Sequence, residues 1–419
     1  MLDSMARTRT TREILPNLHT LEWLFEDVEC MERATIFMHQ RVRHLVISAP
    51  PLDYNHKSSF FVDIGARMPN LLSLDLWVPY SVHPSFIEAD ILELLRGLPH
   101  LKEVIFPEFY LTSTIVSELS RKKHINVIRF KLGCQQVGVE GKFSPILEQG
   151  AFPVLQELEI TARLGDMIRF MNADFSPINI TSLFINTYIE LKPEQLHTLL
   201  ATLSKKCPLL FELYIELLHV PAELELIPAK QITFDTLRPV LSFRNLTRFE
   251  LMHVYPVNIT PEEIEDLASR WPSLEYLRLN EEPLVMHDFT LDLQSLISFA
   301  RHCPKLLRLG LFMDASATKI HTTQELNPFT SLKLLHVGTS QAGDPGAVAA
   351  FLSCLFLPGC EIDAGITWTS YGGSSCRNLD SDLLLAIENR SSHWDSVSDL
   401  LYSSSEGGKE EIEGPMGGS

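Results

Sequence analysis

Glu157 and Glu159 are two carboxylates separated by one residue, a spacing that could place a general acid beside a general base. Such a pair catalyses a reaction only where its surroundings move the two pKa values apart. The flanking residues alternate between apolar and charged, which predicts a strand with both carboxylates on one exposed face. Water at an open sheet face is expected to leave both groups with ordinary acidity, so the pair does not predict an enzyme.

The sequence also lacks the common catalytic and cofactor motifs. Gly-x-x-x-x-Gly-Lys, Gly-x-Gly-x-x-Gly, His-Glu-x-x-His and Gly-x-Ser-x-Gly do not occur. The fifteen histidines are dispersed, and His39 and His44 stand five residues apart, which is not the spacing of one helical face. We interpret the histidines as surface or strand-end residues and expect no catalytic residue, no metal and no cofactor.

One apolar pattern recurs through the chain and predicts the elements that must position these side chains. It reads Leu-x-x-Leu-x-Leu, usually after a proline, as in PNLLSLDLW from Pro69, PSLEYLRL from Pro272 and PKLLRLGL from Pro304. The separation between copies averages about 28 residues, at the long end of the range for leucine-rich repeats. The first apolar position of each copy falls at Leu18, Val42, Leu71, Leu101, Ile125, Leu155, Ile180, Leu210, Leu246, Leu274, Leu306 and Leu332.

Each repeat is expected to form a short strand followed by a helix. Alternate strand residues point to opposite faces, so Leu158 and Ile160 are predicted to enter the core. Helix starts are indicated by Thr260-Pro261, with Glu263 three residues after the cap, and by Asp344-Pro345. The sequence therefore predicts an α/β solenoid, a leucine-rich-repeat horseshoe with a curved parallel sheet on the concave side and helices on the convex side.

Two places depart from the regular spacing. The repeats at Val42 and Ile125 lack the proline and follow short steps, so we expect their helices to be a single turn or absent. The longest step runs from Leu210 to Leu246 and contains HVPAELELIPAKQITF, which predicts an inserted loop or an extra turn.

These patterns divide the chain into three parts. Residues 1–14 are predicted to be a disordered N-terminal segment, and residues 15–368 a leucine-rich-repeat domain of about 12–13 repeats. Residues 369–419 are predicted to be a tail with short amphipathic helices within 379–402 and a disordered acidic end at 403–419. Trp394 would anchor this tail, either as a cap on the last repeat or as part of a docking helix for a partner.

Strand positions three, five and seven of each repeat are predicted to point away from the core, into the concave surface. They combine acidic residues, arginines toward the C-terminal repeats, and aromatic side chains of the types enriched at interface hot spots. Partner binding is the favoured hypothesis because solenoids usually bind there, and the alternative is that these side chains merely solvate the sheet. The candidate binding residues are Asp75, Trp77, Arg129, Glu157, Glu159, Phe184, Glu212, Tyr214, Glu216, Arg248, Glu250, Tyr276, Arg278, Arg308 and Phe312.

The composition limits the class of partner. A net charge of -18 disfavours nucleic acid and anionic lipid, which favours a protein target on the concave face. The seven cysteines are scattered without Cys-x-x-Cys, which is typical of a reduced intracellular protein. No apolar stretch is long enough for a membrane span, and the first residues lack the apolar core of a secretory signal. We expect a cytoplasmic or nuclear protein and a monomer.

Three segments carry a resemblance to a known family. The form Cys-Pro-x-Leu-x-x-Leu-x-Leu at Cys207 and Cys303, the segment FLSCLFLPGCEI and the segment RSSHWDSVSDLL resemble fungal, mushroom-type F-box and leucine-rich-repeat proteins. In that family the repeats recognise the substrate of an SCF-type ubiquitin ligase, while an N-terminal F-box binds the adaptor subunit. The resemblance implies that this chain is a protein-protein interaction module similar to the substrate-recognition part of such a ligase.

The chain departs from that family at its N-terminus. A repeat already begins by Leu15-Pro16, and no Leu-Pro-x-Glu-(Leu/Ile) entry precedes it, so no F-box residue is carried over. Three explanations stay open: an F-box encoded upstream, which would supply adaptor binding, a lost F-box, or a module that only recognises its target. The alternative function is a stand-alone leucine-rich-repeat scaffold or inhibitor without a ligase connection.

Overall fold

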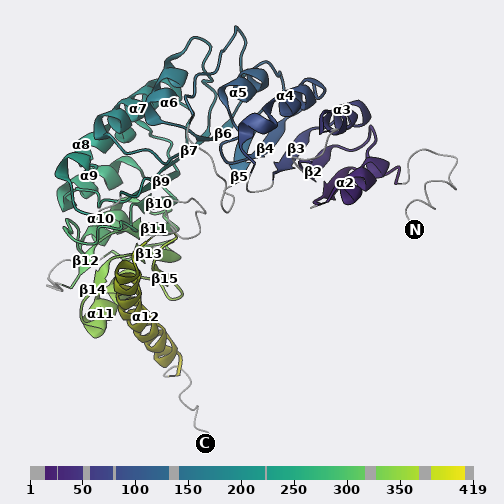
Figure 1. Ribbon diagram of the computed structural model, residues 1–419. Helices are drawn as coiled ribbons and strands as arrows, with labels where there is room; N and C mark the ends of the chain where they lie inside the picture. The colour runs from purple at the N-terminus through teal and green to yellow at the C-terminus, as the bar shows by residue number, and fades with distance from the viewer. Residues whose placement is uncertain are drawn as a thin grey trace, which may run out of the picture. The chain divides into compact units, whose positions relative to one another are not determined.

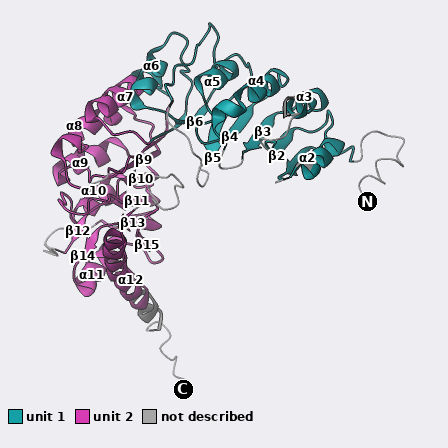
Figure 2. Ribbon diagram, in the orientation of Figure 1, with its two compact units in different colours: residues 1–187, 205–209, 370–377 teal, residues 188–204, 210–369, 378–419 magenta. Residues whose placement is uncertain are grey.

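The computed structural model describes residues 15–25, 27–50, 57–78, 82–131, 141–221, 224–316, 327–367 and 379–410. The chain divides into two compact units (Figure 2). Unit 1 consists mainly of the chain up to Thr187, and unit 2 mainly of the chain from Tyr188 onward. The predicted disordered segment at 1–14 and the end of the tail at 411–419 lie outside the described residues.

Unit 1 is built on parallel strands that lie in the order of the sequence. Its helices lie along one face of these strands (Figure 1). The strands are β1 (Thr20–Trp23), β2 (His44–Ser48), β3 (Ser73–Trp77), β4 (Glu103–Pro107), β5 (Val127–Lys131), β6 (Glu157–Thr161) and β7 (Ser182–Thr187). The helices are α2 (Val28–Ala34), α3 (Lys57–Arg67), α4 (Glu88–Arg96), α5 (Ser113–Ser120) and α6 (Leu164–Asn172).

Unit 2 repeats the pattern, again with parallel strands in sequence order and helices along one face (Figure 1). The strands are β8 (Glu212–Leu217), β9 (Arg248–His253), β10 (Tyr276–Leu279), β11 (Arg308–Leu311), β13 (Leu334–Gly338) and β15 (Glu361–Ala364). A separate two-stranded ladder joins β12 (Asp314–Ala315) to β14 (Gln341–Ala342). The helices are α7 (Pro193–Lys206, almost entirely in this unit), α8 (Phe234–Leu237), α9 (Pro261–Arg270), α10 (Ser295–His302), α11 (Pro345–Leu355) and α12 (Ser381–Glu410). This is the leucine-rich-repeat fold that the sequence predicts.

The repeated apolar positions fill the core as predicted. From Val42 to Leu332 the first apolar residue of every copy is at most 4% exposed, and only Leu18 is half-buried. Leu158 and Ile160 are likewise buried. Full burial of each such side chain stabilises the fold by roughly 1.5–3 kcal/mol, so the buried leucines stabilise each unit.

Where a proline precedes a strand, it lies in a tight turn that leads into that strand. In one repeat the Leu274 amide donates to the Trp271 carbonyl oxygen at 3.1 Å, and in the next the Leu306 amide donates to Cys303 at 3.1 Å. Proline suits the second position of such a turn because its φ is already fixed there. The turn leads directly into the strand and explains why the pattern is written Pro-x-Leu.

The predicted helix starts are present with their capping residues. The Thr260 hydroxyl accepts from the Glu263 amide at 3.3 Å, and the Glu263 carboxylate accepts from the Thr260 amide at 2.8 Å. At α11 the Asp344 carboxylate accepts from the Ala347 amide at 2.9 Å. These reciprocal bonds satisfy amide groups that the first helical turn leaves without a carbonyl partner.

The expectation for the short repeats is wrong. Helices α2 and α5 precede the strands at Val42 and Ile125, and each is about two turns long rather than a single turn or absent. Both have side-chain caps, from Asp27 and Thr112, which stabilise a short helix despite the small number of residues. In the long step, the predicted extra turn is the 3-10 helix Pro228–Lys230.

The tail differs from the prediction of two short helices. Residues 381–410 form one continuous helix, α12, which also extends into the segment predicted to be disordered from residue 403. The reason is that no proline or glycine interrupts the chain between Ser381 and Glu406, so nothing stops the first helix. The helix packs against α11 and β15, and its Trp394 is 1% exposed and donates to the Ser340 carbonyl oxygen at 3.1 Å. Of the two alternatives for this tail, the structure therefore favours the cap on the last repeat of unit 2.

Candidate functional site

The face of the sheet opposite the helices, here called the open face, carries the predicted outward residues in aligned rows. In unit 1 the register places Glu103, Val127, Glu157 and Ser182 side by side, and Ile105, Arg129, Glu159 and Phe184 in the next row. In unit 2 it aligns Glu212, Arg248, Tyr276 and Arg308, and next to them Tyr214, Glu250, Arg278 and Gly310. Most of these side chains are half-buried, whereas the leucines between them are buried on the other face.

Arg129 gathers three carboxylates on the open face of unit 1. Its Nη1 lies 3.2 Å from the Glu103 carboxylate, its Nε lies 3.1 Å from Glu157, and the Glu159 oxygen is 3.9 Å away. Burial alone would lower the pKa of the guanidinium, but these carboxylates outweigh it and raise the pKa. The cluster leaves an excess of negative charge in the centre of this face.

The expectation that Glu159 behaves as an ordinary acid is wrong. Burial raises the pKa of its carboxyl to about 7, although the Phe130 amide, which donates to it at 3.2 Å, and Arg129 act in the opposite direction. The Phe130 and Phe184 rings pack at a tilt of 30° with their centroids 5.3 Å apart. Both carboxylates are engaged in structural contacts, because Glu157 pairs with Arg129 while Glu159 accepts from the backbone.

Asp75 and Trp77 are joined by a lysine that was not among the candidate residues. Lys131 forms an ion pair with Asp75, and its ammonium nitrogen lies 4.1 Å from the centre of the Trp77 ring. Asp75 is only 8% exposed, so it holds Lys131 in place and offers little surface for contact with a partner. Trp77 remains 39% exposed and is the largest aromatic surface of this face in the described part of unit 1.

An arginine–tyrosine ladder, formed by Tyr214, Arg248, Tyr276 and Arg308, crosses the open face of unit 2. The Arg248 guanidinium lies 3.9 Å from the Tyr276 ring centre, and its Nη1 donates to the Tyr214 hydroxyl at 2.6 Å. The Arg308 guanidinium carbon lies 5.6 Å from the centre of the same Tyr276 ring. Burial raises the pKa of Tyr214 to about 12, so the phenol stays neutral and accepts this bond.

Arg278 is buried in a cluster that the sequence analysis did not find. It forms ion pairs with Glu281 and Glu282, which are 2% and 4% exposed, and Glu282 accepts from the Thr367 amide at 2.6 Å. Gly310 leaves room for this cluster, because a Cβ there would lie 2.9 Å from the Glu281 carboxylate. Arg278 therefore cannot serve as a free binding residue without breaking these pairs.

Strand position seven is buried more often than predicted. Phe312 is 6% exposed and stacks on Phe289 with ring centres 4.5 Å apart, so it belongs to the packing rather than to the open face. Asn280 occupies the same position one repeat earlier, accepting from the His253 amide at 2.6 Å and donating to the Tyr255 carbonyl at 2.7 Å. The strands end at this point and the following loops cover the position, whereas Glu216 stays half-buried.

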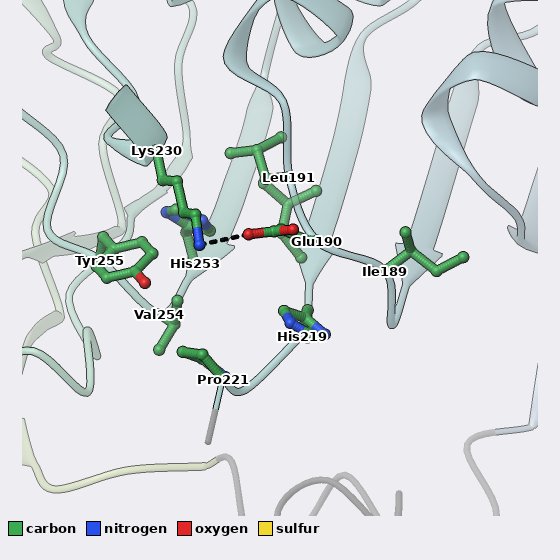
Figure 3. A pocket seen from close by; sticks show the side chains of 10 residues that line it. Ile189, Glu190, Leu191, His219, Pro221, Lys230, His253, Val254 and Tyr255 are labelled. Carbon is green, nitrogen blue, oxygen red and sulfur yellow. Dashed lines mark ion pairs between the residues drawn. The ribbon is translucent and has the colours of Figure 1, made fainter. Parts of the chain in front are cut away.

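A small pocket in unit 2 collects polar side chains that the sequence analysis did not bring together (Figure 3). Lys230 pairs with Glu190 across it, and His253 and Tyr255 line its wall. Burial lowers the pKa of His253 to about 3, which keeps the imidazole neutral. The cavity measures about 10 Å³, the size of one water molecule, so it is too small for an organic ligand.

Searches for two other kinds of site gave negative results within the described ranges. No three His, Cys, Asp or Glu side chains gather there closely enough to hold a metal ion. None of the helices there is long and apolar enough to cross a lipid bilayer.

Comparison with known proteins adds little to this description. No family model and no curated protein sequence matches the chain. Among solved structures, a chain in the crystal structure of the Rad7 and Elc1 complex in yeast is similar at 12% identity, with a TM-score of 0.43, covering 87% of this chain and 81% of that chain. A chain in the Toll–Spatzle complex of Drosophila is similar at 12% identity, with a TM-score of 0.31, covering 88% of this chain and 50% of that chain. At these scores the fold assignment rests on the strand order and register, and no function is transferred.

Proposed function

We propose that this chain is a protein-recognition module that binds its target on the open face of the sheet. One observation carries the proposal: the strands place charged and aromatic side chains in half-exposed rows that the packing of the leucine core does not require. Aromatic rings held beside guanidinium or ammonium groups are the side chains that contribute most at protein interfaces. Repeat proteins also bind extended partners along such faces.

The proposed anchors of the two units are the exposed Trp77 and the half-buried Tyr276, each beside a neighbouring cation. Replacing either one with alanine is expected to weaken target binding, because truncating a central aromatic anchor costs about 2 kcal/mol or more. Val62→Ala on α3 and Arg301→Ala on α10 are matched controls, since both are exposed on helices. Loss of binding in the control variants, with none in Trp77→Ala and Tyr276→Ala, would reject this face as the binding site.

The finer proposal is that the target is a substrate of an SCF-type ubiquitin ligase. Its support is the resemblance of the Cys207 and Cys303 repeats and of the tail around Trp394 to fungal F-box and leucine-rich-repeat proteins. The stand-alone scaffold or inhibitor is the competing function. A pull-down of the purified chain with the ligase adaptor subunit tests the ligase connection: adaptor binding supports it, and no binding leaves either the scaffold or an F-box outside this polypeptide.

A further inference from the structure

The arginine–tyrosine ladder of unit 2 holds two arginines, Arg248 and Arg308, whose guanidinium groups have few carboxylate contacts among the described residues. Arg308 is exposed, and no carboxylate lies within ion-pair distance of it among the described residues. The Nε atom of Arg248 has no hydrogen-bond acceptor in the described part of the chain, and the nearest carboxylate oxygen, from Glu250, is 3.9 Å away. Both guanidinium groups lie over the Tyr276 ring, Arg248 at 3.9 Å and Arg308 at 5.6 Å from its centre.

The neighbouring charges leave these two arginines as the cationic part of the face. Arg278, the third arginine of the ladder region, is already paired with Glu281 and Glu282. Glu250 is half-buried, and burial raises the pKa of its carboxyl. Glu212 flanks the ladder at its other end, opposite Arg248 in the register. Arg248 therefore has two acidic neighbours, whereas Arg308 is an exposed cation without an ion pair among the described residues.

We propose that the ladder binds an acidic peptide segment of the target, with one carboxylate on Arg248 and a second on Arg308. This inference rests on the proposed function and adds the chemistry of the partner. Arg248 and Arg308 both align with Tyr276, so they stand on the two strands that flank β10. Two strand spacings amount to about 10 Å.

A peptide in the polyproline II conformation that crosses β9, β10 and β11 covers that distance in about three residues, and its three-residue turn brings side chains three positions apart to the same face. The expected binding pattern is therefore Glu-x-x-Glu or its aspartate equivalent, with each carboxylate accepting a charge-assisted hydrogen bond from one guanidinium. The apolar parts of the two tyrosines would pack against the residues between the carboxylates. A long polyanion such as nucleic acid is disfavoured because the rest of the chain would repel it.

The test uses the full chain and three fluorescent twelve-residue peptides, made of four Glu-Gly-Ser, four Gln-Gly-Ser or four Lys-Gly-Ser repeats. Fluorescence anisotropy is expected to show the glutamate peptide binding at least about tenfold more tightly than the other two. Added salt is expected to weaken this binding because the ion pairs form at an exposed face. Equal binding of all three peptides, or no binding of the glutamate peptide at about 1 mM, overturns the proposal.

Variants then assign the binding to the ladder. Arg308→Gln and Arg248→Gln are each expected to weaken the glutamate peptide about tenfold, whereas Arg308→Lys retains part of the affinity because the charge remains without the planar contact. Arg301→Gln, on the helix face and paired with Glu265, is the matched control and is expected to bind normally. Arg308 is exposed, so its variants test the proposal even if Arg248→Gln fails to fold. Glutamate-peptide binding that both Gln variants leave unchanged overturns the assignment.

A fourth peptide, of four phosphoserine-Gly-Ser repeats, distinguishes the source of the negative charge. Binding of this peptide without binding of the glutamate peptide overturns the carboxylate assignment. Failure here is separable from failure of the proposed function. If target binding is lost in Trp77→Ala but unchanged in Arg308→Gln, the open face still recognises the target while the ladder does not hold it.

Discussion

Burial sets the pKa of two individual side chains, Glu159 on the open face and His253 in the small pocket of unit 2. Glu159 lies beside Arg129, which favours the ionised carboxylate, yet its pKa is raised to about 7 because desolvation is the larger effect. His253 shows the same cause acting on a base, because burial lowers the pKa of its imidazole to about 3. The two residues therefore give the stability of the fold opposite dependences on pH.

Glu159→Gln is expected to flatten one part of the pH profile of stability. The folded protein keeps a proton on Glu159 up to about pH 7, whereas the unfolded chain releases it near 4.5. Because the folded state binds more protons in this window, the wild type loses stability as the pH rises from 4.5 through 7. Urea unfolding at several pH values measures this loss of stability, and Glu361→Gln at an exposed position is the control. A wild-type minus variant difference that does not fall with pH contradicts the assignment.

His253→Phe is expected to change the acid side of the profile in the opposite direction. The unfolded chain binds a proton on this residue near pH 6.5, but the folded protein does so only at about 3. The wild type therefore loses stability as the pH falls through this window, and the variant is expected to lose less. The exposed ring of His44 offers a control in His44→Phe. An unchanged acid slope in His253→Phe would show that the buried imidazole is not responsible.

At the scale of elements, the repeat was predictable because its signals are local. Pro-x-Leu turns, alternating apolar residues and the Thr260 capping box each lie within a few residues of sequence, and each is present in the structure. The Arg278 cluster was not predictable, because Glu282 contacts Thr367 across 85 residues and only the fold brings them together. The burial of Phe312 was missed for the same reason, since Phe289 from a preceding loop covers it.

Thr260→Ala is expected to destabilise unit 2 by about 1 kcal/mol because it removes the cap of α9. The loss should appear in thermal or urea unfolding, with Ser269→Ala as control, since that exposed hydroxyl donates only to a carbonyl of its own helix. An equal effect of both variants would mean that the reciprocal bonds at Thr260 contribute nothing specific.

Trp394→Ala is expected to lower the free energy of unfolding by about 3–5 kcal/mol, because the indole is buried and its N–H donates to the Ser340 carbonyl oxygen. Repeat proteins are stabilised mainly by neighbouring contacts, so the damage should concentrate near α11, β13 and β15. Hydrogen exchange shows which strands lose protection, and His393→Ala at the adjacent exposed position provides the control. Unchanged protection of β13 and β15 would show that α12 does not cap the array.

At the scale of the whole molecule, each unit separates the residues that make the fold from those available for recognition. The leucines of each strand are buried, and the residues between them differ in charge and aromatic character from one repeat to the next. The sequence predicted these rows by alternation alone. It could not predict that Asp75 and Arg278 form ion pairs within the fold and that Phe312 stacks on Phe289. We propose that a partner contacts Trp77 in unit 1 and the arginine–tyrosine ladder in unit 2.

The most direct test of target binding on the open face is site-specific photo-crosslinking in cells. Benzoylphenylalanine would replace Trp77 or Tyr276 on the open face, and Val62 or Arg301 on the helices as matched controls. We predict crosslinks to the same protein from at least one open-face position and none from the helix positions, and Arg308→Gln or Trp77→Ala in the purified proteins should weaken that interaction. Crosslinks from the helix positions alone would contradict the account.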